Sequence, residues 1–152
     1  MEKKIVITDG EIDLIRPEYE DSEDSFWFDI YLHDTNTRIG EIIYDDEWRN
    51  QELYGNVGYS INDEYQGHNY ARKALELLKQ LLIGKKEKMV FNIFDGNMAS
   101  TMTALGFGAK IVRHGKIPDK YNLGKHSGYD GSYTVFEYDL TTESAIDNKT
   151  IK

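Results

Sequence analysis

The chain has no cysteine, only two prolines among its 152 residues, and no apolar run near the ~20 residues that span a bilayer. The lack of cysteine excludes disulfides, thiolate nucleophiles and cysteine-based zinc sites, and it suits a reducing compartment. The segment after Met1 has no signal-peptide-like apolar region. We therefore expect a soluble, cytoplasmic protein that does not interact with membranes.

Positive charge is also scarce, because 18 Lys and Arg oppose 27 Asp and Glu, which gives a net charge of -9. Binding to nucleic acid is disfavoured, since phosphate neutralisation needs concentrated Lys and Arg. From Glu11 to Glu64 there are 16 acidic residues and three arginines, whereas from Gly67 to Lys125 there are eleven Lys or Arg and four acidic residues. This asymmetry indicates either one cation-receiving and one anion-receiving face or two solvated surfaces without a partner.

The content is otherwise globular, with 39% hydrophobic and 12% aromatic residues. The length favours a single domain, which we expect over residues 1–140, followed by a polar tail over residues 141–152. Alternating or apolar runs predict strands at Glu11–Arg16, Phe26–His33, Arg38–Tyr44, Tyr54–Ile61, Met89–Phe94, Lys110–His114 and Tyr133–Leu140.

Two helices are predicted between these strands. An apolar stripe with a period of 3.6 residues runs from Ala71 to Leu82 and should end at Gly84, and a shorter helix should run from Asn97 to about Gly106. The strand–helix–strand order in the middle of the chain predicts parallel strands beside antiparallel neighbours. The fold class is therefore α+β, with a mixed α/β sheet.

The loop that precedes the long helix is the most informative segment. It begins at Gln66, after the strand that ends at Ile61. Unpaired N–H groups and partial positive charge at a helix N-terminus favour phosphate binding, and Gly67, Asn69 and Ala71 suit close approach, a left-handed conformation and tight packing. The pattern alone fits either a phosphate cradle or an ordinary turn, and it is neither a P-loop nor a dinucleotide fingerprint.

In its context this loop resembles motif A of the GNAT superfamily of acyl-coenzyme A dependent N-acyltransferases. Gln66 stands at the Arg or Gln position of that motif, Asn69 replaces its middle glycine, and Ala71 follows. Asn97 and Gly108-Ala109 resemble a later motif of the same family, in which an Asn opens a short helix that closes in a glycine turn.

The resemblance covers about Ile12 to Leu140 and is greatest to the branch that acts on ribosomal-protein N-termini. It implies a GNAT fold, in which a twisted mixed sheet of about six to seven strands is splayed at a parallel pair. That pair would be Tyr54–Ile61 and Met89–Phe94. The splay would admit acetyl-CoA as cosubstrate.

The resemblance also implies the cofactor-binding residues. The pantetheine arm would pair with the backbone of one strand, the pyrophosphate would lie in the loop, and an Asn would hydrogen-bond the cofactor. In that order these residues are Tyr59, Ser60 and Ile61; Gln66, Gly67, His68, Asn69, Tyr70, Ala71 and Arg72; and Asn97. The basic part of the chain would then serve the cofactor, and the acidic part would receive a cationic amine acceptor.

Two departures from the family concern catalysis. Ala104 occupies the position of the usual tyrosine acid, and Asn92 occupies that of the usual glutamate base. Weak substitutes are Glu41 and Glu52 as bases and Tyr59, Tyr121 and Tyr129 as acids. The chain is therefore either an N-acetyltransferase or a noncatalytic acyl-CoA-binding module of the same fold.

For the enzyme we expect direct attack, in a ternary complex, by an amine that is already partly deprotonated. An α-amine, with a pKa of about 7.7–8.0, meets this condition better than a lysine side chain, with a pKa of about 10.4. The acceptor is then a peptide α-amine or a small amine, and the enzyme is a possible homodimer. The histidines His33, His114 and His126 are too scattered to predict a metal site.

Overall fold

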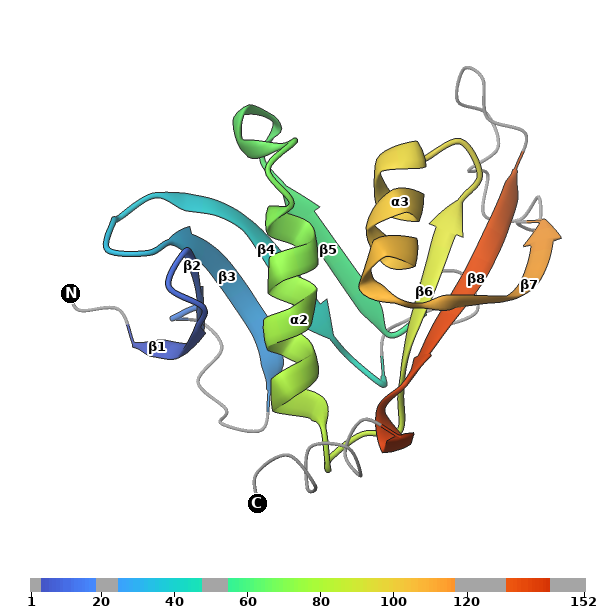
Figure 1. Ribbon diagram of the computed structural model, residues 1–152, viewed down its shortest axis with the longest axis horizontal. Coiled ribbons are helices and arrows are strands. Elements are labelled where there is room, and N and C mark those ends of the chain that lie inside the picture. The colour runs from blue at the N-terminus through green and yellow to red at the C-terminus, as the bar shows by residue number, and fades with distance from the viewer. Residues whose placement is uncertain (1–3, 19–24, 48–54, 117–130, 143–152) are drawn as a thin grey trace.

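The computed structural model describes residues 4–18, 25–47, 55–116 and 131–142, which form two sheets and three helices (Figure 1). The five-stranded sheet contains, in spatial order, β1 (Ile5–Thr8), β2 (Ile12–Ile15), β3 (Phe26–Leu32), β4 (Arg38–Tyr44) and β5 (Val57–Ile61). The three-stranded sheet contains, in spatial order, β6 (Lys88–Phe94), β8 (Ser132–Asp139) and β7 (Lys110–Lys116). The helices are η1 (Asp63–Tyr65), α2 (Tyr70–Leu82) and α3 (Met98–Phe107).

The core forms where α2 covers one face of the five-stranded sheet. Alternation places Leu14, Ile30 and Ile42 on that face, and all three are fully buried. Leu75 and Leu78 of α2 are buried in the same cluster. The apolar stripe thus forms the predicted helix, and none of the helices in the described ranges is long and apolar enough to cross a bilayer.

The α+β class is confirmed, but the single mixed sheet of six to seven strands is wrong, because the described residues form eight strands in two sheets. Every ladder among the described residues is antiparallel. β5 and β6, the expected parallel pair, share no ladder and are joined by one isolated antiparallel bridge between Gly55 and Phe91. β8 lies between β6 and β7, so these two strands are not neighbours.

The two sheets meet at Gly55 and Asn56. Gly55 has φ +72, and a Cβ atom there would lie 2.4 Å from the carbonyl oxygen of Val90, so only glycine permits this approach. The Asn56 side chain extends the junction, because its Oδ1 accepts from Val90 N at 2.7 Å and its Nδ2 donates to Lys88 O at 3.3 Å. β5 and β6 start near each other and then point apart (Figure 1), so the expected splay is present.

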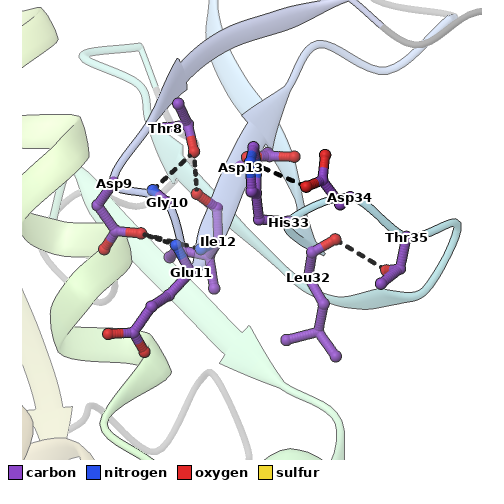
Figure 2. A network of polar contacts seen from close by, with 10 residues as sticks. All are labelled: Thr8, Asp9, Gly10, Glu11, Ile12, Asp13, Leu32, His33, Asp34 and Thr35. Carbon is purple, nitrogen blue, oxygen red and sulfur yellow. Dashed lines mark hydrogen bonds and ion pairs between the residues drawn. The ribbon is translucent and has the colours of Figure 1, made fainter.

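A network of polar contacts surrounds the turn between β1 and β2 and the end of β3 (Figure 2). Asp9 Oδ1 accepts from the backbone N–H groups of Glu11 and Ile12 in the turn between β1 and β2. His33 Nδ1 lies 2.8 Å from the buried carboxylate of Asp13, whose hydrogen bond raises the pKa of His33 above its usual value. The sequence patterns predicted neither β1 nor η1.

Candidate functional site

A cleft of about 360 Å³ opens where the end of β5, the loop before α2 and the first turn of α3 meet. Nine of the eleven residues predicted to bind cofactor line it, namely Tyr59, Ser60, Ile61, Gln66, Gly67, Asn69, Tyr70, Ala71 and Asn97. Sequence reasoning missed three further lining residues, Tyr65, Ala99 and Ser100. Ala99 and Ser100 follow Asn97 within the motif that opens α3, but no binding role was predicted for them, and Tyr65 belongs to no motif.

The loop before α2 presents backbone donors to this cleft. Gly67 and Asn69 both have left-handed backbone conformations, with φ of +88 and +63. Asn69 is the N-cap residue of α2, yet its side chain makes no capping hydrogen bond, and the first turn contains no acidic residue. The first N–H groups of α2 therefore remain without a side-chain cap, and the partial positive charge of the helix end is not neutralised locally.

Three residues of the loop region have other contacts. Gln66 Nε2 donates to Ile61 O at 2.9 Å, so this side chain fixes the loop to the end of β5. His68 and Arg72 do not line the cleft. The His68 ring lies 5.4 Å from that of Tyr70, and Arg72 lies beside α3, where a Cβ atom on Gly106 would be 3.6 Å from its guanidinium.

Among the described residues, β5 has a ladder along one edge and none along the other. It pairs with β4 on one side, where Ser60 lies opposite Glu41 and Tyr59 opposite Ile42. On the other side, within the described part of the chain, its ladder hydrogen bonds end at the junction with β6. Such a strand edge offers backbone donors and acceptors to an extended ligand.

The opposite wall of the cleft is the first turn of α3. Asn97 caps this helix, and its Oδ1 accepts from Ser100 N at 3.2 Å. The Tyr59 hydroxyl of β5 donates to Ser100 O at 3.2 Å, and its ring packs edge-on against Phe91 with centroids 6.3 Å apart. Burial raises the pKa of Tyr59 to about 12, so its hydroxyl stays protonated at neutral pH.

Of the remaining catalytic candidates the structure describes Glu41 alone, and this residue does not line the cleft. Glu41 lies on β4 with its side chain 46% exposed, 3.6 Å from the guanidinium of Arg38. Ala104 is fully buried in α3, and Asn92 lies on β6. Glu52, Tyr121 and Tyr129 lie outside the described residues. Within those residues no group of three His, Cys, Asp or Glu side chains is placed to hold a metal ion.

Comparisons with protein families and with solved structures agree on the family and on the fold of this chain. The family model described as an acetyltransferase (GNAT) domain matches residues 8–110. No curated protein sequence matches significantly. Among solved structures, a ribosomal-protein-S5-alanine acetyltransferase from Vibrio fischeri is 18% identical with a TM-score of 0.60, and the match covers 77% of this chain and 62% of that one.

Two other similar structures were solved with cofactor. The microcin C7 self immunity acetyltransferase MccE, in complex with acetyl-CoA and AMP, is 19% identical with a TM-score of 0.55 over 78% of this chain and 62% of that one. The ribosomal L7/L12 α-N-protein acetyltransferase RimL, in complex with coenzyme A, is 15% identical with a TM-score of 0.56 over 75% and 61%. The chain thus spans about three fifths of these structures. With a family model over two thirds of its length and the GNAT architecture in its fold, the chain belongs to the GNAT acetyltransferase family.

Proposed function

We propose that this protein transfers an acetyl group from acetyl-CoA to a primary amine in a ternary complex. The observation that carries the proposal is the meeting of the ladder-free edge of β5 with the N-terminus of α2 in one cleft. A strand edge suits the amides of pantetheine, and a helix N-terminus suits a pyrophosphate. Acetyl-CoA contains both groups, because its extended pantetheine arm is joined at one end to the pyrophosphate and carries the thioester at the other.

The cofactor would follow the cleft from β5 to α2. The backbone of Tyr59–Ile61 would pair with the pantetheine, the loop from Gln66 to Arg72 would surround the pyrophosphate, and Asn97 would contact the arm from α3. Small residues support this placement, because Gly67 and Ala71 leave the backbone of the loop accessible. His68 and Arg72 would contribute charge from the margin of the loop rather than from inside the cleft.

The reaction would proceed by direct attack. The amine nitrogen attacks the thioester carbon, the carbon–sulfur bond breaks, coenzyme A leaves as the thiolate, and the proton of the new ammonium passes to water. Backbone N–H groups of β5 would stabilise the oxyanion. The buried Ala104 and the amide of Asn92 support a mechanism without the usual acid and base, in which positioning supplies much of the rate.

The acceptor would carry positive charge in addition to its reacting amine. The described residues 4–18 and 25–47, which include most of the five-stranded sheet, contain ten Asp or Glu and three Lys or Arg. A peptide α-amine or a small polyfunctional amine satisfies both this charge and the need for a free lone pair at neutral pH.

A homodimer is part of the proposal. The outward face of α3 exposes Met98, Met102 and Leu105, and the helix contains no charged residue, so two copies can place this face together without like-charge repulsion. Sedimentation of Met102→Glu and the wild type over a range of concentrations tests this part. A wild type that stays monomeric at high concentration would refute it.

The second candidate function is a noncatalytic acyl-CoA-binding module, which the same Ala104 and Asn92 favour. Thermal-shift titration with acetyl-CoA, followed by a thiol-release assay over a panel of amines, separates the two. Thiol release on an amine supports the enzyme, and stabilisation without release on any amine supports the module. The absence of stabilisation would refute both.

The pH–rate profile tests the mechanism. With Glu41→Gln and Glu52→Gln we expect cofactor affinity to persist together with the limb of the profile in which the rate rises with pH, because that limb reports deprotonation of the acceptor amine itself. If either substitution removed that limb and most of kcat while acetyl-CoA still bound, a carboxylate base would be acting and direct attack would be wrong.

A further inference from the structure

A chain of two hydrogen bonds crosses the cleft from β5 to the cap of α3. The Tyr59 hydroxyl donates to Ser100 O at 3.2 Å, and Ser100 N donates to Asn97 Oδ1 at 3.2 Å. Ser100 of α3 thus makes two hydrogen bonds. Its carbonyl accepts from Tyr59 of β5, and its N–H donates to the cap residue Asn97. The position of the Asn97 side chain therefore depends on the Tyr59 hydroxyl, which comes from the five-stranded sheet.

This contact lies at the opening of the splay, whereas the junction at Asn56 lies at its narrow end. Tyr59 follows Asn56 by three strand positions, which corresponds to about 10 Å of extended chain. Over that distance the two sheets have separated, because only the isolated bridge between Gly55 and Phe91 pairs their backbones. A side chain as long as tyrosine is needed to reach from β5 to α3.

The contact is also partly shielded from water, on the side that faces the core. The Tyr59 ring packs against the fully buried Phe91 and joins the margin of the hydrophobic core. A hydrogen bond in such surroundings is electrostatically stronger than one in water. Its loss would release the first turn of α3 while most of the ring packing stayed in place.

We infer that Tyr59 is a positioning residue, which holds Asn97 and the first turn of α3 at the distance from β5 that the pantetheine arm requires. The inference rests on the proposed function for the identity of the ligand. It assigns to the Tyr59 side chain a role distinct from that of its backbone and from proton transfer. The cleft width is then set by two ties, Asn56 at the narrow end and Tyr59 at the open end.

The first experiment compares Tyr59→Phe with the wild type for coenzyme A and for ADP, by calorimetric titration. ADP has the pyrophosphate but lacks pantetheine. We expect coenzyme A affinity to fall about two- to tenfold, which is the range of one hydrogen bond, and ADP affinity to stay unchanged. Equal weakening of both ligands, or no weakening of coenzyme A, would overturn the inference.

The matched control is Tyr133→Phe. This buried tyrosine also loses a hydroxyl hydrogen bond, which it accepts from Arg113 Nη1 at 3.1 Å, but it lies on β8, does not line the cleft and does not hydrogen-bond to Asn56 or Asn97. We expect Tyr133→Phe to lower stability without changing coenzyme A affinity. If it weakened coenzyme A as much as Tyr59→Phe does, the effect would be general destabilisation and the inference would be wrong.

A double-mutant cycle and hydrogen exchange test the connection itself. Because Tyr59 is inferred to act through Asn97, the double variant Tyr59→Phe, Asn97→Ala should bind coenzyme A no more weakly than Asn97→Ala. Without any ligand, Tyr59→Phe should speed amide exchange over residues 99–103 of α3. Additive effects or unchanged exchange would refute the positioning role even if acetyl-CoA binds, whereas a wild type that binds neither coenzyme A nor ADP would refute the proposed function.

Discussion

Replacement of Asn56 by alanine should be among the most destabilising single changes at the junction of the two sheets. The Asn56 residue is 9% exposed, and its amide makes three hydrogen bonds, with Val90 N at 2.7 Å and with Lys88 O and the Tyr44 hydroxyl at 3.3 Å each. Alanine would leave the Val90 N–H without this partner and the Lys88 carbonyl with only the Tyr44 hydroxyl, at 3.4 Å. At about 1–3 kcal/mol for the unsatisfied Val90 N–H and about 1 kcal/mol for the hydrogen bond lost at Lys88, we expect a loss of about 2–4 kcal/mol, from a total of about 5–15 kcal/mol.

Urea denaturation followed by tryptophan fluorescence measures this loss as a change in the free energy of unfolding. Asn62→Ala is the matched control, because the Asn62 amide also donates to a backbone carbonyl, that of Arg38 at 3.3 Å, but is exposed. Its replacement should change the free energy of unfolding by no more than about 0.5 kcal/mol. If Asn56→Ala cost no more than Asn62→Ala, the Asn56 amide would not hold the sheets together.

Asn56→Asp sharpens the test, because the carboxylate keeps an acceptor for Val90 N but replaces the donor to Lys88 O with an oxygen. Burial should raise the pKa of this aspartate above its unfolded value of about 3.9. A raised folded-state pKa means that the variant is least impaired below about pH 3.9 and loses stability as the pH rises through the folded-state value. The stability difference from the wild type should therefore grow between acidic and neutral pH, and a constant difference would contradict this reasoning.

Three further predictions concern single positions. Ala104→Tyr should cost about 1–3 kcal/mol through overpacking at a fully buried site and should not raise kcat, so a faster enzyme of unchanged stability would refute it. His33→Gln should remove the stabilisation that the charged His33 gains from Asp13. In the wild type this stabilisation is fully present below pH ~6.5 and is lost as the pH rises through the raised pKa of His33. Denaturation curves at several pH values measure it, and an identical pH dependence of the two proteins would contradict the role given to the His33–Asp13 pair. Asn69→Gly should be tolerated, whereas Asn69→Val should cost about 1–2 kcal/mol because of the φ of +63; equal melting temperatures would refute this.

The sequence predicted the elements that have a clear period. The stripe from Ala71 to Leu82 specifies α2 because it buries one face, and Arg38–Tyr44 matches β4 at both ends. The order of strands in space was harder, since nothing local in Ser132–Asp139 states that this strand inserts between β6 and β7. Ile5–Thr8 was missed because it is a short edge strand that buries little.

The candidate site shows the same limit. The glycine and small residues of the loop from Gln66 to Ala71 are a local signal, and the resemblance to the family motif distinguishes a cofactor loop from an ordinary turn. No role was predicted for Ser100, and its importance arises from a tyrosine 41 positions earlier in the chain. The role of Asn56 was also hidden, because a polar residue beside a strand is ordinary until the partner backbone of Val90 is known.

The placement of β8 has a consequence for the order in which the protein is built. The five-stranded sheet is made of sequential antiparallel neighbours, so its long-range contacts are available as soon as residues 5–61 have emerged from the ribosome. The three-stranded sheet cannot form at that stage, because β6 and β7 both pair with a strand that is synthesised after them. Until Ser132–Asp139 arrives, the apolar residues of β6, such as Met89 and Phe91, have no ladder partner. Vectorial synthesis therefore delays the sheet against which α3, one wall of the cleft, is packed until β8, the last strand among the described residues, is made.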